Sequence, residues 1–176
     1  MLLSLDISSA KTGYAFLEEK CGKISVLKSG VIFTKLKAGQ TYYRVGDIDM
    51  SIDRKFLEAF DLFWRENFNL FLHTKEVIIE SPIFRRNHRV AIITGIVHGF
   101  VRSFLSRFSF ERIGTMDNKS WKAIYCHHGG AKKTYTKELV ESEYKIKALT
   151  DDESDAIAMG TAYLIKKRED LKNDNK

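Results

Sequence analysis

Cysteine and proline are both scarce in this chain, and each scarcity excludes a class of protein. Cys21 and Cys126 are the two cysteines among 176 residues, which is too few for a disulfide framework. The single proline, the 44% of hydrophobic residues and the lack of repeats or low-complexity tracts argue against extended disorder. We therefore expect a domain that is held together by a hydrophobic core rather than by disulfides.

Long uncharged apolar runs are also missing, and none approaches the roughly 18 residues that span a bilayer. No basic and apolar leader precedes the first predicted strand. The length allows one sizeable core and leaves little room for a second. We predict a single domain over residues 1–168, a polar tail over residues 169–176, a cytoplasmic location and no membrane partner.

Positive charge is concentrated in one part of the chain. Between Ser81 and Lys137, eleven basic residues stand against Glu111 and Asp117, a net charge of +9, whereas the whole chain carries +6. A one-sided basic segment is typical of proteins that bind a polyanion, most often nucleic acid. A solvated surface that keeps the protein soluble explains the same charges equally well.

Apolar patterning predicts five strands and five helices. LLSLDI, GYAFLEE and KISVLKSGVIF are three strands joined by short turns, hence an antiparallel meander. EVIIES is an apolar run typical of a strand buried on both faces, and FSFERIG is a fifth strand. Helical spacing covers residues of about 40–71, 89–105, 118–128, 134–145 and 152–170. This order predicts an α/β fold, in which a five-stranded mixed sheet combines the meander with parallel strands and is flanked by helices.

Four carboxylates lie in or beside these apolar segments. Asp6 is in the first strand and Glu80 ends the fourth, while Asp152 and Asp155 are on one face at the start of the last helix. A satisfied structural acid explains any one of them, and helix capping explains the last two. Neither explanation accounts for acids at two strand ends as well, and if those strands are neighbours all four acids converge.

A converging group of four acids needs protons or cations, because two like charges about 4 Å apart repel by roughly 4 kcal/mol at an effective dielectric of about 20. Oxygen ligands select hard ions, so we expect Mg²⁺, with Mn²⁺ as a substitute. Two such ions can activate a water and stabilise the leaving oxygen of a phosphodiester. Together with the basic segment, the acids predict a nuclease or a related phosphoryl-transfer enzyme.

Four segments resemble, in order and spacing, the signature regions of the RuvC-like Holliday-junction resolvases: LSLDISSAKTGYA, VIIESP, KSWKAIYCHHGGAKK and DDESDAIAMG. The resemblance covers residues 3 to about 164. It implies an RNase H-like fold and a homodimer that cuts two opposed strands of a four-way DNA junction with Mg²⁺. The short single-domain form looks more like the bacteriophage or poxvirus members, which implies a location in the host cytoplasm.

The resemblance also implies roles for single residues. Asp6, Glu80, Asp152 and Asp155 become catalytic ligands of two metal ions. Asp151 is a rival for Asp152, because it lies four residues before Asp155 and on the same helix face; the spacing within the family favours Asp152.

Basic residues near these acids are the expected DNA contacts. The family places lysines around a loop between two helices, where Lys132 or Lys133 either stabilises charge in the transition state or only clamps a phosphate. RRNHR is suited to bidentate phosphate contacts or is a solvated loop. Phe84 stands one residue beyond the position of the family's junction wedge. The predicted DNA-binding residues are Lys11, Phe84, Arg85, Arg86, Arg89, Lys119, Lys122, Lys132 and Lys133.

Small residues recur every fourth position on the second predicted helix, at Ala91, Gly95 and Gly99. In the family this helix lies at the dimer interface, so we predict a two-fold homodimer, with close packing inside one chain as the alternative. The predicted function is a Mg²⁺-dependent endonuclease that resolves branched DNA, especially four-way junctions, by paired nicks. A broader nuclease for branched DNA or RNA, and a junction-binding protein that does not cut, remain alternatives.

Overall fold

The structure is a computed structural model of the chain, and it describes residues 1–34, 44–45, 48–49, 51–83, 87–147 and 150–174. The side chains of residues 44–45, 48–49, 51–55 and 89 are outside this description.

A five-stranded mixed sheet forms the centre of the molecule, in the order β3-β2-β1-β6-β7. Its first three strands form an antiparallel meander, and β6 and β7 continue the sheet parallel to β1. The α/β prediction of a meander joined to parallel strands is therefore confirmed. The strands are β1 (Leu2–Asp6), β2 (Lys11–Lys20), β3 (Lys23–Phe33), β6 (Glu76–Glu80) and β7 (Arg112–Met116).

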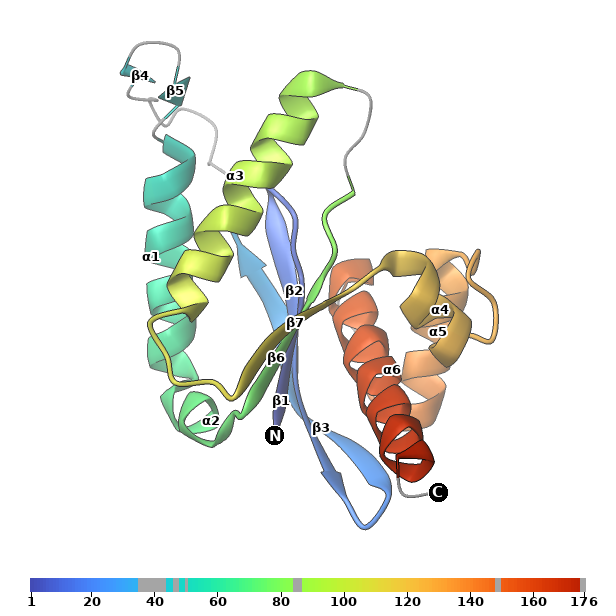
Figure 1. Cartoon of the computed structure of the whole chain (residues 1–176). Coiled ribbons are helices and arrows are strands. Elements are labelled where there is room, and N and C mark those ends of the chain that lie inside the picture. The colour runs from blue at the N-terminus through green and yellow to red at the C-terminus, as the bar shows by residue number, and fades with distance from the viewer. Residues whose placement is uncertain (35–43, 46–47, 50, 84–86, 148–149, 175–176) are drawn as a thin grey trace.

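Helices cover both faces of this sheet (Figure 1). On one face lie α1 (Ser51–Glu66), α2 (Phe68–His73) and α3 (His88–Leu105). On the other lie α4 (Asn118–Tyr125), α5 (Lys133–Tyr144) and α6 (Asp151–Asn173). Among the described helices, none is long and apolar enough to cross a membrane.

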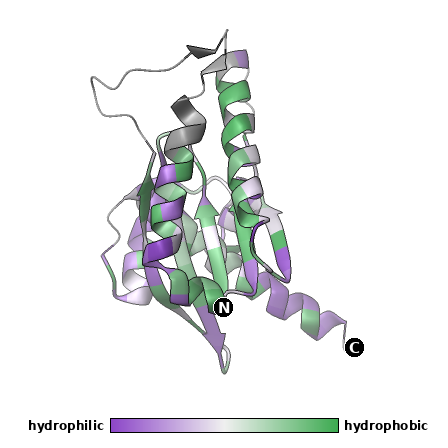
Figure 2. Cartoon of the chain, turned by 90° about the vertical axis from the view of Figure 1, so that its left-hand side faces the viewer, coloured by the Kyte–Doolittle hydropathy of each residue, from purple (hydrophilic) through white to green (hydrophobic). Residues whose placement is uncertain are grey.

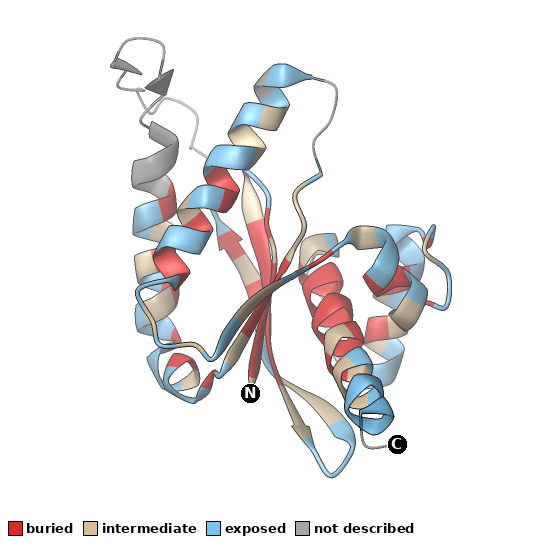
Figure 3. Ribbon diagram, viewed as in Figure 1, coloured by how far each residue is buried: buried red, intermediate tan, exposed pale blue. Residues whose placement is uncertain are grey.

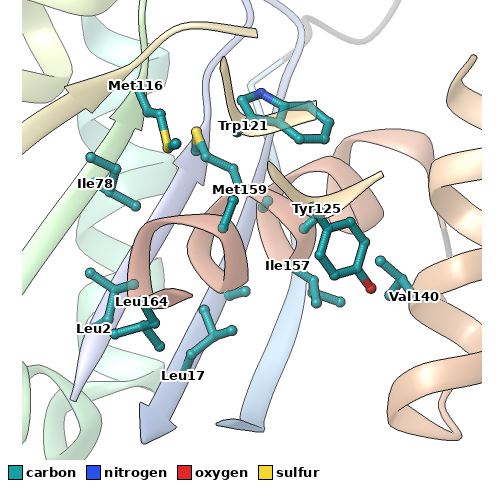
Figure 4. Packing of buried hydrophobic residues seen from close by; sticks show 14 of the residues in the cluster. Leu2, Leu17, Ile78, Met116, Trp121, Tyr125, Val140, Ile157, Met159 and Leu164 are labelled. Atoms are coloured by element: carbon teal, nitrogen blue, oxygen red, sulfur yellow. The ribbon is translucent and has the colours of Figure 1, made fainter. Parts of the chain in front are cut away.

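Side chains alternate between the two faces along each strand, and they build two separate cores. Leu3 and Leu5 of β1 join a cluster with the phenylalanines of α1, such as Phe60 and Phe63. Leu2 belongs to the opposite cluster, which packs β1, β2 and β6 against α4, α5 and α6 (Figure 4). The sheet centre and the inner helix faces are accordingly buried (Figure 3), which explains the continuous apolar run of β6.

The prediction of one helix over residues of about 40–71 was wrong in where the helix starts and in its continuity. β4 (Arg44–Val45) and β5 (Ile48–Asp49) pair as a short hairpin, and α1 begins only at Ser51. Asn67 interrupts the segment, because its side-chain amide donates to the carbonyl of Phe63, at 2.7 Å, and α2 restarts after it.

Two other boundaries differ from prediction. The fifth strand begins at Arg112 rather than near residue 108, because the rings of Phe108 and Phe110 pack on each other and on Phe71 instead of joining the sheet. The last helix continues to Asn173, so most of the predicted tail is helical. The domain boundary at Arg168 itself stays a prediction.

Candidate active site

Two acids end neighbouring strands at the same edge of the sheet. β1 and β6 are parallel, with Leu5 paired to Ile79, so Asp6 and Glu80 are the last residues of adjacent strands. The first turn of α6 lies at this end of the sheet too, while its C-terminus lies at the other end (Figure 1). The fold thus brings α6, with Asp152 and Asp155, to the two strand ends, as the convergence argument requires.

Gly13 allows α6 to start so close to the sheet. It pairs with Asp6 in the ladder between β1 and β2. A Cβ at this position would lie 1.9 Å from the carbonyl oxygen of Asp152, a distance that no side chain tolerates. A glycine is therefore required here for the helix start to sit against the strand that carries Asp6.

Asp6 is partly buried at the end of β1, and the other acids lie close enough to act on the pKa of its carboxyl group. Burial raises the pKa of its carboxyl group well above the ordinary value, and the charges of Glu80, Asp155 and Asp152 raise it further. The ammonium group of Lys133 opposes the shift without cancelling it. Asp6 is therefore in surroundings that penalise its charge, and an additional cation would relieve that penalty.

Asp155 is in a similar position on α6. Its exposed fraction is 3%, and burial raises the pKa of its carboxyl group to about 6, against the opposing charges of Lys133 and Lys122. Its Oδ1 atom is buried and accepts no hydrogen bond from the described residues. A buried carboxylate oxygen without a partner is available to a ligand.

Lys133 lies between the two acids of α6. Its Nζ atom is 3.6 Å from Oδ1 of Asp152 and 3.4 Å from Oδ2 of Asp155, and Nζ of Lys11 is 2.9 Å from Oδ2 of Asp152. The acids raise the pKa of Lys133 although its burial acts in the opposite direction. Asp151 is exposed and takes part in none of these three ion pairs. The structure therefore brings Asp152 rather than Asp151 to this centre.

Glu80 is held by two side chains that the sequence argument missed. The amide of Asn118 and the indole N–H of Trp121, both on α4, donate to the same oxygen, Oε1, at 2.7 and 2.9 Å. Two donors on one oxygen fix the carboxylate and leave its second oxygen for other partners. Asn118 and Trp121 both lie in the sequence NKSW, residues 118–121. The spacing of these residues did not indicate that the chain after β7 places the start of α4 beside Glu80.

The atoms at this centre that could bind a metal ion suit a hard divalent cation. They are oxygens of carboxylates, the type of ligand that Mg²⁺ and Mn²⁺ select. One of these oxygens has no hydrogen-bond partner in the described chain, and Asp6 bears a penalty for its charge. Among the described residues, no group of three or more His, Cys, Asp or Glu side chains is already arranged to hold a metal ion. Instead, the ammonium group of Lys133 contacts two of the four acids.

The remaining predicted residues are placed unevenly. Lys119 and Lys132 are exposed near the same end of the sheet, but no described contact joins them to the acids. Lys122 is only 8% exposed, and its ammonium group lies 5.2 Å from the ring centre of Trp121. Its role as a DNA contact stays a prediction. Phe84, Arg85, Arg86 and the side chain of Arg89 lie outside the described residues.

Comparison by sequence finds no relative: no protein-family model matches the chain, and no curated protein matches it. Comparison by structure finds several. The chain matches Thermus thermophilus RuvC in complex with Holliday junction substrate, with a TM-score of 0.74 at 15% identity, over 96% of this chain and 94% of that one.

Two further solved structures share the fold. The yeast mitochondrial Holliday junction resolvase Ydc2 matches with a TM-score of 0.60 at 14% identity, over 92% of this chain and 76% of that chain. The fowlpox virus resolvase, solved with substrate Holliday junction DNA, matches with a TM-score of 0.51 at 14% identity, over 94% and 97%. At these identities the likeness is one of fold.

Proposed function

Because the chain has the RNase H-like fold of RuvC-type resolvases, we propose that it is a Mg²⁺-dependent endonuclease that resolves four-way DNA junctions by paired strand nicks. The observation that carries this proposal is the convergence of Asp6, Glu80, Asp152 and Asp155 at one end of the sheet. A fold explains why acids can meet there, but it does not explain why the pKa values of two of them, Asp6 and Asp155, remain raised.

The four acids would hold two ions, and these would supply an activated water and stabilise the leaving oxygen of a phosphodiester. Asn118 and Trp121 hold the Glu80 carboxylate in one orientation. In this proposal Lys133 contacts the non-bridging oxygens of the scissile phosphate once it leaves the acids. Its ammonium group is already at the centre, which favours it over Lys132 for that role.

DNA binding is proposed for the basic segment around this centre. Lys11 is half-exposed beside Asp152, and Lys119 and Lys132 project from the start of α4 and the start of α5. Charges spread over a groove neutralise phosphates and make the affinity depend on salt. The contacts of Arg85, Arg86 and Arg89, and the wedge role of Phe84, stay predictions from the sequence.

A homodimer through α3 belongs to the same proposal. The outward face of α3 carries Ile92 and Ile96, which are 62% and 41% exposed, and a Cβ at Gly95 or Gly99 would have no atom of the described chain within 4 Å. These glycines therefore do not serve close packing against the described residues. In Figure 2, which views this side of the molecule, most of the α3 ribbon is hydrophobic. An open apolar stripe with small residues suits a second copy of the helix.

Sedimentation tests the dimer. We expect the native chain to sediment as a dimer at micromolar concentration, with or without DNA, and Ile92→Glu to give a folded monomer. Leu72→Glu, on α2 with a comparably exposed apolar side chain, serves as the control and should leave the dimer intact. A native chain that is monomeric under both conditions removes this part of the proposal.

Cleavage assays test the activity. End-labelled four-way junction, three-way branch and linear duplex are incubated with the protein in Mg²⁺ or EDTA, beside the Asp155→Asn variant. Paired nicks in the junction that require Mg²⁺ and Asp155 are the expected result. Equal cutting of the three-way branch would broaden the enzyme to a branch nuclease. Tight binding without cleavage in any divalent ion would make it a junction-binding protein.

A further inference from the structure

A pocket next to the acidic centre has no role in the chemistry proposed so far. Its volume is about 240 Å³, and it lies between the turn after β1, the residues that follow β6 and the N-terminal half of α3. Glu80 forms part of its wall. Because Glu80 belongs to both places, a group that fills this pocket lies beside the proposed site of phosphodiester cleavage.

His98 is a polar side chain of this wall with a buried ring nitrogen that has no hydrogen-bond partner among the described residues. Its exposed fraction is 7%, and its Nδ1 atom is buried and forms no hydrogen bond with any described residue. Thr94, one turn earlier in the same wall, donates its hydroxyl to the carbonyl of Val90 instead. Buried polar atoms in folded proteins are normally satisfied, so this nitrogen points to a partner from outside the chain.

In its neutral form the imidazole of His98 can both donate and accept a hydrogen bond. Burial lowers the pKa of the imidazole, the charge of Arg102 lowers it further, and the charge of Glu80 acts in the opposite direction. A neutral imidazole carries one donor and one acceptor. It can therefore form hydrogen bonds with the edge of a ligand that itself offers donors and acceptors.

The size and lining of the pocket select the kind of ligand. Its volume equals the share of about eight water molecules in the liquid, which is below the roughly 300 to 1,000 Å³ of pockets for drug-sized molecules. Ile83 and Val90 supply apolar contact, and Ser81 supplies a hydroxyl. A phosphate would meet the negative charge of Glu80, whereas a neutral planar heterocycle would not.

We propose that this pocket receives one unstacked nucleobase next to the scissile phosphate, and that His98 hydrogen-bonds to the edge of that base and makes recognition base-selective. The inference rests on the proposed function, since it takes DNA as the ligand. A base is most easily unstacked where pairing is already interrupted, as at the branch point of a junction. His98 is then a specificity residue, while the acids remain the catalytic ones.

The test is a panel of four-way junctions that differ only in the bases at the three positions nearest the branch point. Affinity is measured in Ca²⁺ with the Asp6→Asn chain, and cleavage in Mg²⁺ with the otherwise native chain. We expect the best and worst bases at one position to differ by about two- to tenfold, the range of a single hydrogen bond. His98→Phe, which keeps a flat ring, should bring this ratio to about one, and His98→Gln should retain part of it.

His73→Phe is the matched control, because His73 is exposed on α2 and its ring forms a hydrogen bond with the carbonyl of Asn69 on the same helix. It should leave the ratio unchanged. A ratio within one variant does not move when that variant is merely less stable. The inference is overturned if the native chain shows no base preference, or if His98→Phe keeps the native ratio.

The two proposals fail in different ways. If the Asp6→Asn chain binds with a base preference that needs His98 but the native chain never cuts, the pocket stands and the nuclease does not. If the native chain cuts junctions with no base preference, the nuclease stands and the pocket does not.

Discussion

The two ends of strand β6 differ in how the protein compensates the acids that lie there. Glu76 begins β6, accepts a hydrogen bond from the hydroxyl of Tyr163 at 2.6 Å and forms an ion pair with Lys167. Burial opposes ionisation there, but Lys167 and Tyr163 outweigh it and lower the pKa of Glu76. Glu80 ends the same strand beside Asp6, whose pKa is raised well above its ordinary value.

The comparison separates a structural acid from a candidate functional one. α6 crosses the sheet face and supplies both surroundings, a phenol and an ammonium group at the amino end of β6 and two more acids at the carboxyl end. The fold compensates the first end completely with its own side chains. It leaves the second end short of positive charge, which is what a metal ion would supply.

The largest expected effect is the difference in cleavage rate between two single variants, each of which removes the acid at one end. Asp6→Asn should lower the rate of junction cleavage by about 10³-fold or more, because metal ligands contribute several kcal/mol to the transition state. Glu76→Gln should leave the rate within about twofold, because Glu76 lies at the other end of β6 from the acids. Junction affinity in Ca²⁺ should not fall for either variant. Equal losses of cleavage for both would erase the distinction between the two ends.

A smaller effect is expected when Glu80 loses one of its two donors. Asn118→Leu should reduce cleavage by about 10- to 100-fold, the usual range for residues that orient metal ligands. The Mg²⁺ concentration for half-maximal rate should rise, which a purely structural loss would not cause. Asn69→Leu, at an exposed position of α2, is the control. An unchanged Mg²⁺ requirement in Asn118→Leu would show that this hydrogen bond has no positioning role.

Stability in EDTA should change in opposite directions at the two ends. Asp6→Asn removes a buried charge that its neighbours repel, so the melting temperature should rise by about 2 to 4 °C. Glu76→Gln breaks an ion pair and should lower it by a similar amount. Mg²⁺ should then stabilise the native chain and have less effect on Asp6→Asn. A lower melting temperature for Asp6→Asn would mean that Asp6 is a compensated structural acid.

The pH dependence of stability should also have opposite signs. The folded pKa of Glu76 is lowered, so its contribution is present above the unfolded value of about 4.3 and is lost as the pH falls through the folded pKa. The folded pKa of Asp155 is raised to about 6. Its contribution is therefore complete below about 3.9 and is lost as the pH rises through about 6.

Chemical unfolding in EDTA between pH 3 and 8 measures both slopes. The free-energy difference between the native chain and Glu76→Gln should grow with rising pH, by about 1 kcal/mol. The difference between the native chain and Asp155→Asn should shrink over the same range. Parallel pH profiles for the two pairs would contradict the assignment of opposite environments.

Much of the sheet could be predicted from the sequence because its strands carry strong local signals. The apolar runs around Leu3 and Ile78 and the turn at Gly22 locate these strands along the chain, while the pairing of β1 with β6 comes from the structure. Local patterning did not reveal the start of α1 at Ser51 or the break at Asn67, since helical spacing continues across both. These boundaries depend on a hairpin and on one side-chain hydrogen bond.

The candidate site was predictable in its acids and less so in their partners. An acid at the end of an apolar strand is unusual enough to stand out, and Asp6 and Glu80 were found in this way. The burial of Lys122, the place of Lys133 between two acids and the donors on Glu80 all follow from how α4 and α5 pack on α6. Such contacts between distant segments leave no periodic trace in the sequence.

The most direct test of the central claim is to count bound ions. Mn²⁺ is titrated into the native chain, Asp6→Asn and Glu76→Gln without DNA, and free Mn²⁺ is followed by its electron paramagnetic resonance signal. We predict two ions per chain for the native protein and for Glu76→Gln, and weaker or fewer ions for Asp6→Asn. Binding that Asp6→Asn leaves unchanged, or no binding at millimolar Mn²⁺, would contradict the claim that this end of the sheet is a metal centre.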